Sequence, residues 1–85
     1  MANIALEKVM EHIPKITFLN HRGTAQTLAM IESLSALEKS LPGDTVITHN
    51  DRRPEELIAE IKKLRYSYKL LELPDGSIKV KIYKP

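Results

Sequence analysis

The sequence predicts an α/β (α+β) two-layer sandwich in which both helices lie on one face of a four-stranded mixed sheet. Three observations lead to this fold class. Two segments place apolar residues every three or four positions, as amphipathic helices do. Four shorter segments are rich in β-branched and aromatic residues, as strands are. Turn sequences with Pro, Gly, Asn or Asp separate these segments in the order β-α-β-α-β-β, and an extra helix is predicted before the first strand.

The extra helix is predicted within residues 1–14, ahead of the main domain at residues 15–85. Its apolar residues recur at helical spacing and are Leu6, Val9, Met10 and Ile13. Pro14 ends the pattern. A helix of this length is marginal by itself, so we expect its apolar stripe to dock on the open face of the sheet or on a second copy.

The first strand is predicted over residues 15–21 and the longer helix over residues 24–40. Ile16 and Phe18 fall on one face of this strand because successive strand side chains alternate. Thr24 is the candidate N-cap of the helix. A set of apolar residues at helical spacing predicts its buried face, namely Leu28, Ile31, Leu34, Leu37 and Leu41.

A buried strand is predicted over residues 45–49, a β-branched run between two turn segments. In the next helix Pro54 suits the first turn, where its missing N–H is not needed. The buried stripe of that helix consists of Leu57, Ile58, Ile61 and Leu64.

The last two strands, residues 66–73 and 77–83, flank a Leu-Pro-Asp-Gly-Ser turn and should form an antiparallel hairpin. In the second arm the residues expected to face the core are Ile78, Val80 and Ile82. In the first arm Leu70 and Leu71 interrupt the alternation, which predicts a bulge or burial on both faces there.

Composition excludes several classes of function. The chain of 85 residues is long enough for one domain. It has no cysteine, which excludes a disulfide framework, a thiolate nucleophile and a cysteine-ligated metal. No apolar run approaches the roughly 20 residues that span a bilayer, and no basic region precedes an apolar stretch at the N-terminus. We therefore expect a cytoplasmic protein without a membrane partner.

Three polar motifs stand between the predicted elements: Asn20-His21-Arg22-Gly23, Leu41-Pro42-Gly43-Asp44-Thr45 and Asn50-Asp51-Arg52-Arg53-Pro54. Their residues and spacing over about residues 15–84 resemble the TusA/SirA-like family of small sulfur-carrier domains, and in particular the cysteine-less branch of that family. The resemblance implies the same two-layer domain, with partner docking or ligand binding at the edge where these motifs meet.

The chain departs from the sulfur carriers at the start of the first long helix, where that family has a Cys-Pro-x-Pro segment. Counting on from Gly23 places Gln26 at the cysteine position, with Thr27 and Ala29 at the two proline positions. A carboxamide cannot hold a persulfide, so the sulfurtransferase activity of the family is not expected here. The resemblance then implies a non-enzymatic binding or adaptor module connected with sulfur or redox physiology.

The polar residues that follow the first two strands should lie together, because parallel strands end at the same edge of a sheet. They are His21, Arg22, Gly23, Thr24 and Gln26 after the first strand, and His49, Asn50, Asp51, Arg52 and Arg53 at the end of the second. Helix N-termini and arginine side chains both favour anions. We predict that this edge binds a small anion or another protein. The alternative is that Asn50 and Asp51 only cap or turn the chain, with Arg22 paired to Asp51.

Metal binding and catalysis have weaker support in the sequence. His21, His49 and Asp51 are a candidate ligand set, but no pair has the i, i+4 spacing of a recognisable metal motif. His12 is expected at the surface. No serine stands in a nucleophile elbow, and there is no glycine-rich phosphate loop. We therefore predict no bound metal, no cofactor and no enzymatic activity.

The basic C-terminal part of the chain suggests an alternative function. Residues 62–85 have seven Lys or Arg against two acidic residues, although the whole chain has a net charge of only +2. Lysines on strands commonly protect sheet edges, but they also neutralise nucleic-acid backbones beside stacking aromatic rings. The alternative is an RNA or other nucleic-acid-binding module that uses Lys79, Lys81 and Tyr83, with Lys84, Tyr66 and Tyr68 in the same outward row. In either case we expect a monomer or a weak homodimer.

Overall fold

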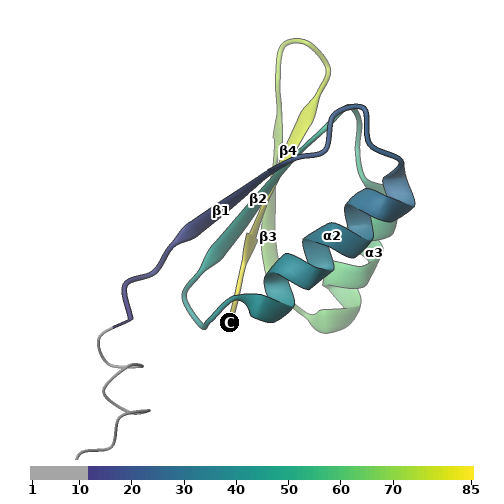
Figure 1. The fold of residues 1–85 in the computed structure, drawn as a ribbon. Coiled ribbons are helices and arrows are strands. Elements are labelled where there is room, and N and C mark those ends of the chain that lie inside the picture. Colours follow the sequence, from purple (N-terminus) through teal and green to yellow (C-terminus); the bar gives the residue numbers. More distant parts are fainter. Residues whose placement is uncertain (1–11) are drawn as a thin grey trace, which may run out of the picture.

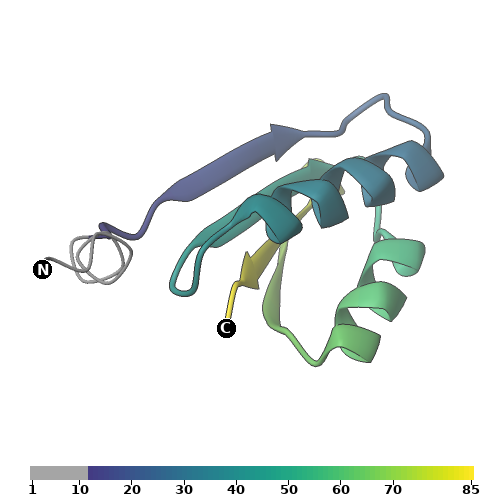
Figure 2. The same ribbon diagram turned by 60° about the horizontal axis from the view of Figure 1, so that its bottom comes forward.

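The structure is a computed structural model that describes residues 12–85. Its elements follow the predicted order: β1 (Ile16–Asn20), α2 (Gln26–Lys39), β2 (Thr45–Asn50), α3 (Glu55–Leu64), β3 (Ser67–Glu72) and β4 (Ile78–Tyr83). The strands form one sheet in the order β1-β2-β4-β3, in which β1 and β2 are parallel and the other two pairs are antiparallel. Both helices lie on the same face of this sheet (Figures 1 and 2). The four-stranded mixed sheet and the two-layer arrangement are thus confirmed.

The core lies between the helices and the sheet. Its fully buried apolar side chains are Leu37, Leu57 and Ile61 from the helices and Val46, Val80 and Ile82 from the sheet. Val46 pairs with Ile82 across the β2–β4 ladder, and side chains directly opposite each other share a face. The intervening residues of the same strands, including Ile47 and Lys81, therefore face away from the helices.

Helix α2 buries a stripe that only partly matches the one predicted from its large apolar residues: Leu37 is buried and Leu34 packs against the core, as predicted. The buried residues are Ala29, Ser33 and Leu37, whereas Leu28, Ile31 and Leu41 are about half exposed and Leu34 is half-buried. The small side chains of Ala29 and Ser33 allow a close approach of α2 to the rest of the protein. The Ser33 hydroxyl donates to the Ala29 carbonyl at 2.7 Å, so its burial leaves no unsatisfied donor.

Two further expectations about α2 and α3 are also wrong. Thr24 is not the N-cap of α2: the helix begins one residue later, with Ala25 in the cap position and no side-chain hydrogen bond to the free amides. Helix α3 buries Leu57, Ile58 and Ile61 as predicted, but Leu64 is half exposed. Leu64 belongs to the last turn, just before Arg65 adopts the left-handed conformation that ends the helix.

The β3–β4 hairpin is regular, so the predicted bulge is wrong. Every residue from Ser67 to Glu72 has one partner in β4, including Leu70 opposite Val80 and Leu71 opposite Lys79. Both leucines are exposed because β3 is the edge strand beyond β4, so neither of its faces is fully covered.

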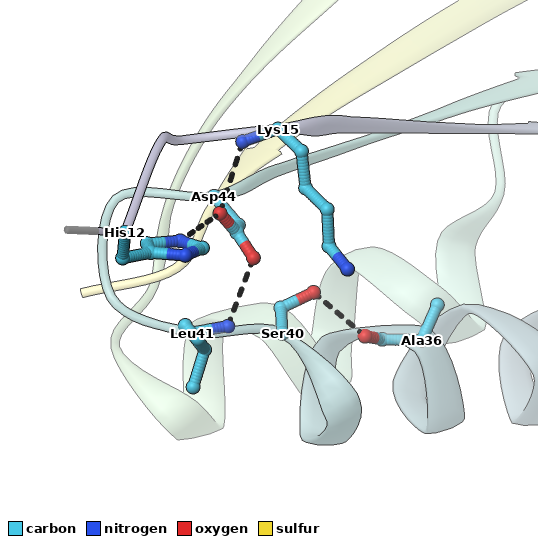
Figure 3. Close-up of polar contacts among 6 residues, drawn as sticks. All are labelled: His12, Lys15, Ala36, Ser40, Leu41 and Asp44. Atoms are coloured by element: carbon cyan, nitrogen blue, oxygen red, sulfur yellow. Dashed lines mark hydrogen bonds and ion pairs between the residues drawn. The ribbon is translucent and has the colours of Figure 1, made fainter. Parts of the chain in front are cut away.

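A buried carboxylate joins the start of β1 to the loop between α2 and β2. Oδ1 of Asp44 accepts from the Lys15 amide at 3.1 Å and lies 2.7 Å from Nε2 of His12, and Oδ2 accepts from the Leu41 amide at 3.0 Å (Figure 3). These bonds, first those from Leu41 and Lys15 and then that from His12, lower the pKa of Asp44 from 3.8 to about 2. His12 was expected at the surface, and the structure places its partly buried side chain in this network.

The extra N-terminal helix falls almost entirely outside the described residues. The described part of that segment, residues 12–14, has no regular secondary structure, and Ile13 is 82% exposed in the single chain. Within residues 12–85 there is no helix with the length and apolar character needed to cross a membrane.

Candidate functional site

The loops that follow β1 and β2 are tied to each other at one edge of the sheet. The His21 amide donates to the His49 carbonyl at 2.8 Å, which extends the parallel ladder by one bond. The Gly23 amide donates to Oδ2 of Asp51 at 2.6 Å. Gly23 has a φ of +78°, a conformation that side chains disfavour, so glycine suits this turn. The two polar motifs therefore meet as their positions after parallel strands predict.

A cavity of about 370 Å³ lies where these loops meet the N-terminus of α2. Its lining residues come from both loops and both helix starts: His21, Thr24, Ala25, Gln26, Ala29, Asn50, Asp51, Arg52 and Pro54. We call this the α2 cavity. It includes Gln26, the residue at the cysteine position of the sulfur carriers that the sequence resembles.

His21 is the most buried ionisable side chain of the α2 cavity, and 6% of the residue is exposed. Its Nε2 lies 3.5 Å from Oε1 of Glu32, and its Nδ1 is buried with no hydrogen-bond partner among residues 12–85. A buried polar atom without a partner is unfavourable by about 1–3 kcal/mol. Native proteins therefore keep few such atoms, and those they keep often belong to functional sites.

The N-terminus of α2 adds positive electrostatic potential to the same cavity. The first amides of a helix have no acceptor within the helix. Within residues 12–85 no side chain caps them, and the first turn of α2 has no acidic residue of its own. The carboxylate that contacts this turn is that of Glu56 in α3, which accepts from the Thr27 hydroxyl at 3.0 Å. Since Ala25 and Gln26 line the cavity, this positive helix end opens onto it. The guanidinium of Arg52 is the cationic side chain in the lining.

The three arginines predicted at this edge, Arg22, Arg52 and Arg53, have different surroundings. Nε of Arg22 donates to Oδ1 of Asn20 at 3.1 Å, so the alternative pairing of Arg22 with Asp51 does not form. Nε of Arg53 lies 2.9 Å from Oε1 of Glu55. Neither residue lines the α2 cavity. Of the three, Arg52 is placed to contact a ligand there.

His49 points away from the α2 cavity. It alternates with the core-facing Thr48, and its Nε2 lies 2.8 Å from the hydroxyl of Ser77. Asn50 is buried and donates to Oγ1 of Thr48 at 2.9 Å, which makes it a structural part of the cavity wall. The candidate metal set of His21, His49 and Asp51 is therefore spread over two faces of the sheet. Within residues 12–85 no three His, Asp or Glu side chains form a group suited to a metal ion.

The sequence analysis did not find the chain of hydrogen bonds from His49 through Ser77 to Asp75. The hydroxyl and the amide of Ser77 both donate to Oδ1 of Asp75 and lower the pKa of that carboxyl. The hydroxyl proton is thus directed to Asp75, and the hydroxyl accepts from His49. In a catalytic triad the carboxylate instead holds the far nitrogen of the histidine, so this arrangement differs from a triad. The contact between Asp75 and Ser77 could have been predicted from the Pro-Asp-Gly-Ser turn at residues 74–77, because Asp in a turn commonly accepts a hydrogen bond from the residue two positions later.

The open face of the sheet forms a second candidate surface. It has a shallow cavity of about 430 Å³ lined by apolar side chains and three lysines: Phe18, Ile47, Lys69, Leu70, Leu71, Lys79 and Lys81. The ammonium group of Lys79 lies 5.2 Å from the centre of the Phe18 ring, and that of Lys81 lies 5.5 Å from the centre of the Tyr83 ring. Both rings thus already contact a cation.

The outward row that the nucleic-acid alternative requires is only partly present on this face. Tyr68 stands opposite Ile82 and therefore faces the helices. Lys84 donates to the carbonyl of Leu37 at 2.9 Å and lies over the ring of Tyr66, also on the helix side. Lys79, Lys81 and Tyr83 remain on the open face.

The sequence and the fold of this chain were compared with those of known proteins. No protein-family model matches the chain, and no curated protein matches it. Among solved structures, the SirA-like protein of Desulfitobacterium hafniense superposes with a TM-score of 0.70 at 24% sequence identity, over 80% of this chain and 95% of that one. The chain has a SirA-like fold. The resemblance seen in the sequence motifs is thus confirmed at the level of the fold, and the SirA-like fold here has no cysteine.

Proposed function

We propose that this protein is a small non-enzymatic binding module that takes up an anionic group in the α2 cavity. The observation that supports this function most strongly is the combination of an uncapped helix N-terminus with a buried histidine that has an unpartnered nitrogen in the same cavity wall. The helix amides and Arg52 would bind the negative charge, and a ring N–H of His21 would donate a further hydrogen bond.

The lining also indicates what else the ligand should have. Oδ2 of Asp51 accepts from the Gly23 amide, and the carboxylate lines the cavity, where it presents an acceptor with negative charge. An anion that also donates a hydrogen bond fits this combination better than a fully deprotonated one. Hydrogen phosphate and the carboxylate of a hydroxy acid both have such a donor.

The surroundings of the α2 cavity favour a protein as the natural carrier of that anionic group. Leu28, in the first turn of α2, is 52% exposed and lies in the sequence between Gln26 and Ala29 of the cavity lining. A partner that inserts such an anionic group into the cavity would bury this leucine at the same time. Gln26 replaces the sulfur-carrying cysteine of the family that the sequence resembles, so we propose an adaptor that keeps a docking role in sulfur or redox physiology without transferring sulfur.

A matched pair of neighbouring arginines tests the proposed site. Arg52 lines the α2 cavity, whereas Arg53 is paired with Glu55 outside it. Loss of one charge-assisted hydrogen bond removes about 1.5–3 kcal/mol, or roughly 10- to 100-fold in affinity. Calorimetric titration with sodium phosphate should show that loss for Arg52→Gln and little change for Arg53→Gln. Equal affinities for the two variants, or no binding by the wild-type protein, would contradict the proposal.

A second candidate function is nucleic-acid binding through the open face, which is favoured by the three lysines around Phe18. Binding to a phosphate backbone should weaken steeply with salt and should depend on Lys79 and Lys81. Affinity capture from a lysate, with bound proteins and bound nucleic acid both identified, separates the two functions. Wild-type protein and Arg52→Gln should differ in the proteins captured under the first function and should capture the same RNA under the second.

A further inference from the structure

The edge strand β1 lacks the features that normally keep a sheet edge from pairing. It and β3 are the two outer strands, and β3 has the charged residues Lys69 and Glu72. The sequence of β1, Ile-Thr-Phe-Leu-Asn, has no charge and no proline. Its exposed apolar residues are Ile16, 65% exposed, and Phe18, 52% exposed. Monomeric proteins usually protect such an edge with charges, proline or a bulge, so this edge is suited to pairing with another strand.

The backbone groups of β1 that have no partner among residues 12–85 can be assigned from its pairing with β2. The Lys15 carbonyl accepts from the Thr45 amide, and the His21 amide donates to the His49 carbonyl. Residues with odd numbers therefore direct their backbone groups toward β2. Because these directions alternate along a strand, the amides and carbonyls of Ile16 and Phe18 point to the free edge.

An antiparallel copy of β1 satisfies these groups when the two-fold axis passes through Thr17. Ile16 then stands opposite Phe18 of the second copy, and each exchanges both of its backbone hydrogen bonds with the other. The same register repeats on the other side of the axis, since a two-fold interface is self-complementary. In this register the side chain of Ile16 contacts that of Phe18 from the second copy on the open face, once on each side of the axis. A β-branched residue opposite an aromatic residue is a favourable cross-strand pair.

The helix side of the same edge has matching charges. A groove of about 460 Å³ runs between β1 and α2, lined by Lys15, Thr17, Leu19, Ile31, Glu32, Ser35, Ala36, Lys39 and Ser40. Helix α2 runs antiparallel to β1 (Figure 1). From Lys15 to Leu19 the strand advances about 13 Å, and from Ile31 to Ser40 the helix advances about the same length. Thr17 is therefore level with the turn of Ser35 and Ala36.

A two-fold axis at that level places Glu32 of one copy across from Lys39 of the other. Each residue lies about one helical turn from the level of the axis, on opposite sides of it. The two ion pairs of opposite sign form only if the second molecule is an antiparallel copy of this chain, because Glu32 and Lys39 exchange roles across the axis. We propose that the β1 edge binds a second copy of this chain to form a two-fold homodimer with one continuous sheet.

Charge reversal tests this interface without removing any core residue. Lys39→Glu also leaves the α2 cavity unchanged, whereas Glu32 lies 3.5 Å from the ring of His21. Analytical ultracentrifugation of the wild-type chain over a concentration series should show a species of twice the 9.7 kDa chain mass. Glu32→Lys and Lys39→Glu should each weaken the dimer about tenfold, since two ion pairs become two like-charge contacts. An equimolar mixture of the two variants should form heterodimers as tight as the wild-type dimer. The double variant should form a homodimer of the same affinity, because both ion pairs are restored with their signs exchanged.

Ile16→Pro is the complementary test of the strand pairing. Proline at this position removes only an outward amide and leaves the hydrogen bonds to β2 in place. Circular dichroism should therefore show a folded protein, and ultracentrifugation should show that it is a monomer. A wild-type chain that stays monomeric at several hundred micromolar would overturn the proposal. So would a dimer that survives Ile16→Pro, or single reversals that do not rescue each other when mixed, because both results place the contact elsewhere or with a different partner.

Discussion

Two leucines in the same helix provide the sharpest test of the packing. Leu37 is 1% exposed in the centre of the core, whereas Leu28 is 52% exposed on the outer side of α2. Replacement by Ala removes the same atoms in both cases. At Leu37 this loses about 0.8 kcal/mol for each buried carbon and leaves a cavity as well, for a total of about 2–5 kcal/mol. At Leu28 about half of the transfer free energy applies and no cavity forms, so about 1 kcal/mol is expected.

Urea denaturation followed by circular dichroism measures both changes. The slope of the unfolding free energy against urea concentration should be the same in both variants. The difference between their urea midpoints is then proportional to the difference in their stability. For a domain of this size each kcal/mol corresponds to about 4–8 °C in Tm, and Leu37→Ala should therefore melt at least 4 °C below Leu28→Ala. Equal losses, or a larger loss for Leu28→Ala, would mean that α2 packs through the side of Leu28 and Ile31 rather than through the side of Ala29, Ser33 and Leu37.

Two buried polar contacts give further predictions. Because the pKa of Asp44 is lowered from 3.8 to about 2, its contribution to stability is complete above about pH 4 and is lost as the pH falls toward 2. The difference in unfolding free energy between wild type and Asp44→Asn should therefore shrink over that range, and a difference that stays constant would contradict this role. Ser77→Ala should destabilise the protein by about 1–3 kcal/mol, because Nε2 of the buried His49 loses its partner. In a thermal-melting double-mutant cycle with His49→Phe the two losses should not add, and additive losses would show that the contact does not stabilise the fold.

The order and pairing of the strands could be predicted because they depend on local signals. Pro-Gly-Asp at residues 42–44 and Pro-Asp-Gly at residues 74–76 end one element and begin the next, and a strand-helix-strand unit has a preferred handedness. The buried face of α2 could not be predicted in the same way. Both the series that starts at Leu28 and the series Ala29, Ser33, Leu37 have helical spacing. The choice between them depends on how closely the helix approaches the rest of the protein, which is a tertiary property.

The candidate site was predictable in position but not in its lining. The ends of two parallel strands had to meet, which brought His21 and Asp51 to one edge. The direction of each long side chain depends on its nearest partner: Asn20 holds Arg22, and Glu55 holds Arg53. Both contacts join residues two positions apart in the sequence, where spacing alone did not exclude the alternative pairing of Arg22 with Asp51, and they leave Arg52 at the cavity. The outward direction of His49 could have been inferred from strand alternation with Val46 and Thr48.

In the proposed site the α2 cavity binds an anion through the free amides of α2, Arg52 and His21. The most direct measurement is a phosphate titration of the ¹⁵N-labelled protein, followed through the backbone amides and the histidine ring nitrogens. Saturable shifts should concentrate on the His21 ring and on the amides of Gln26 and Thr27, with residues 78–84 unaffected. Shifts confined to residues 78–84, or an unchanged His21 ring at saturating phosphate, would contradict the assignment of this cavity as the binding site.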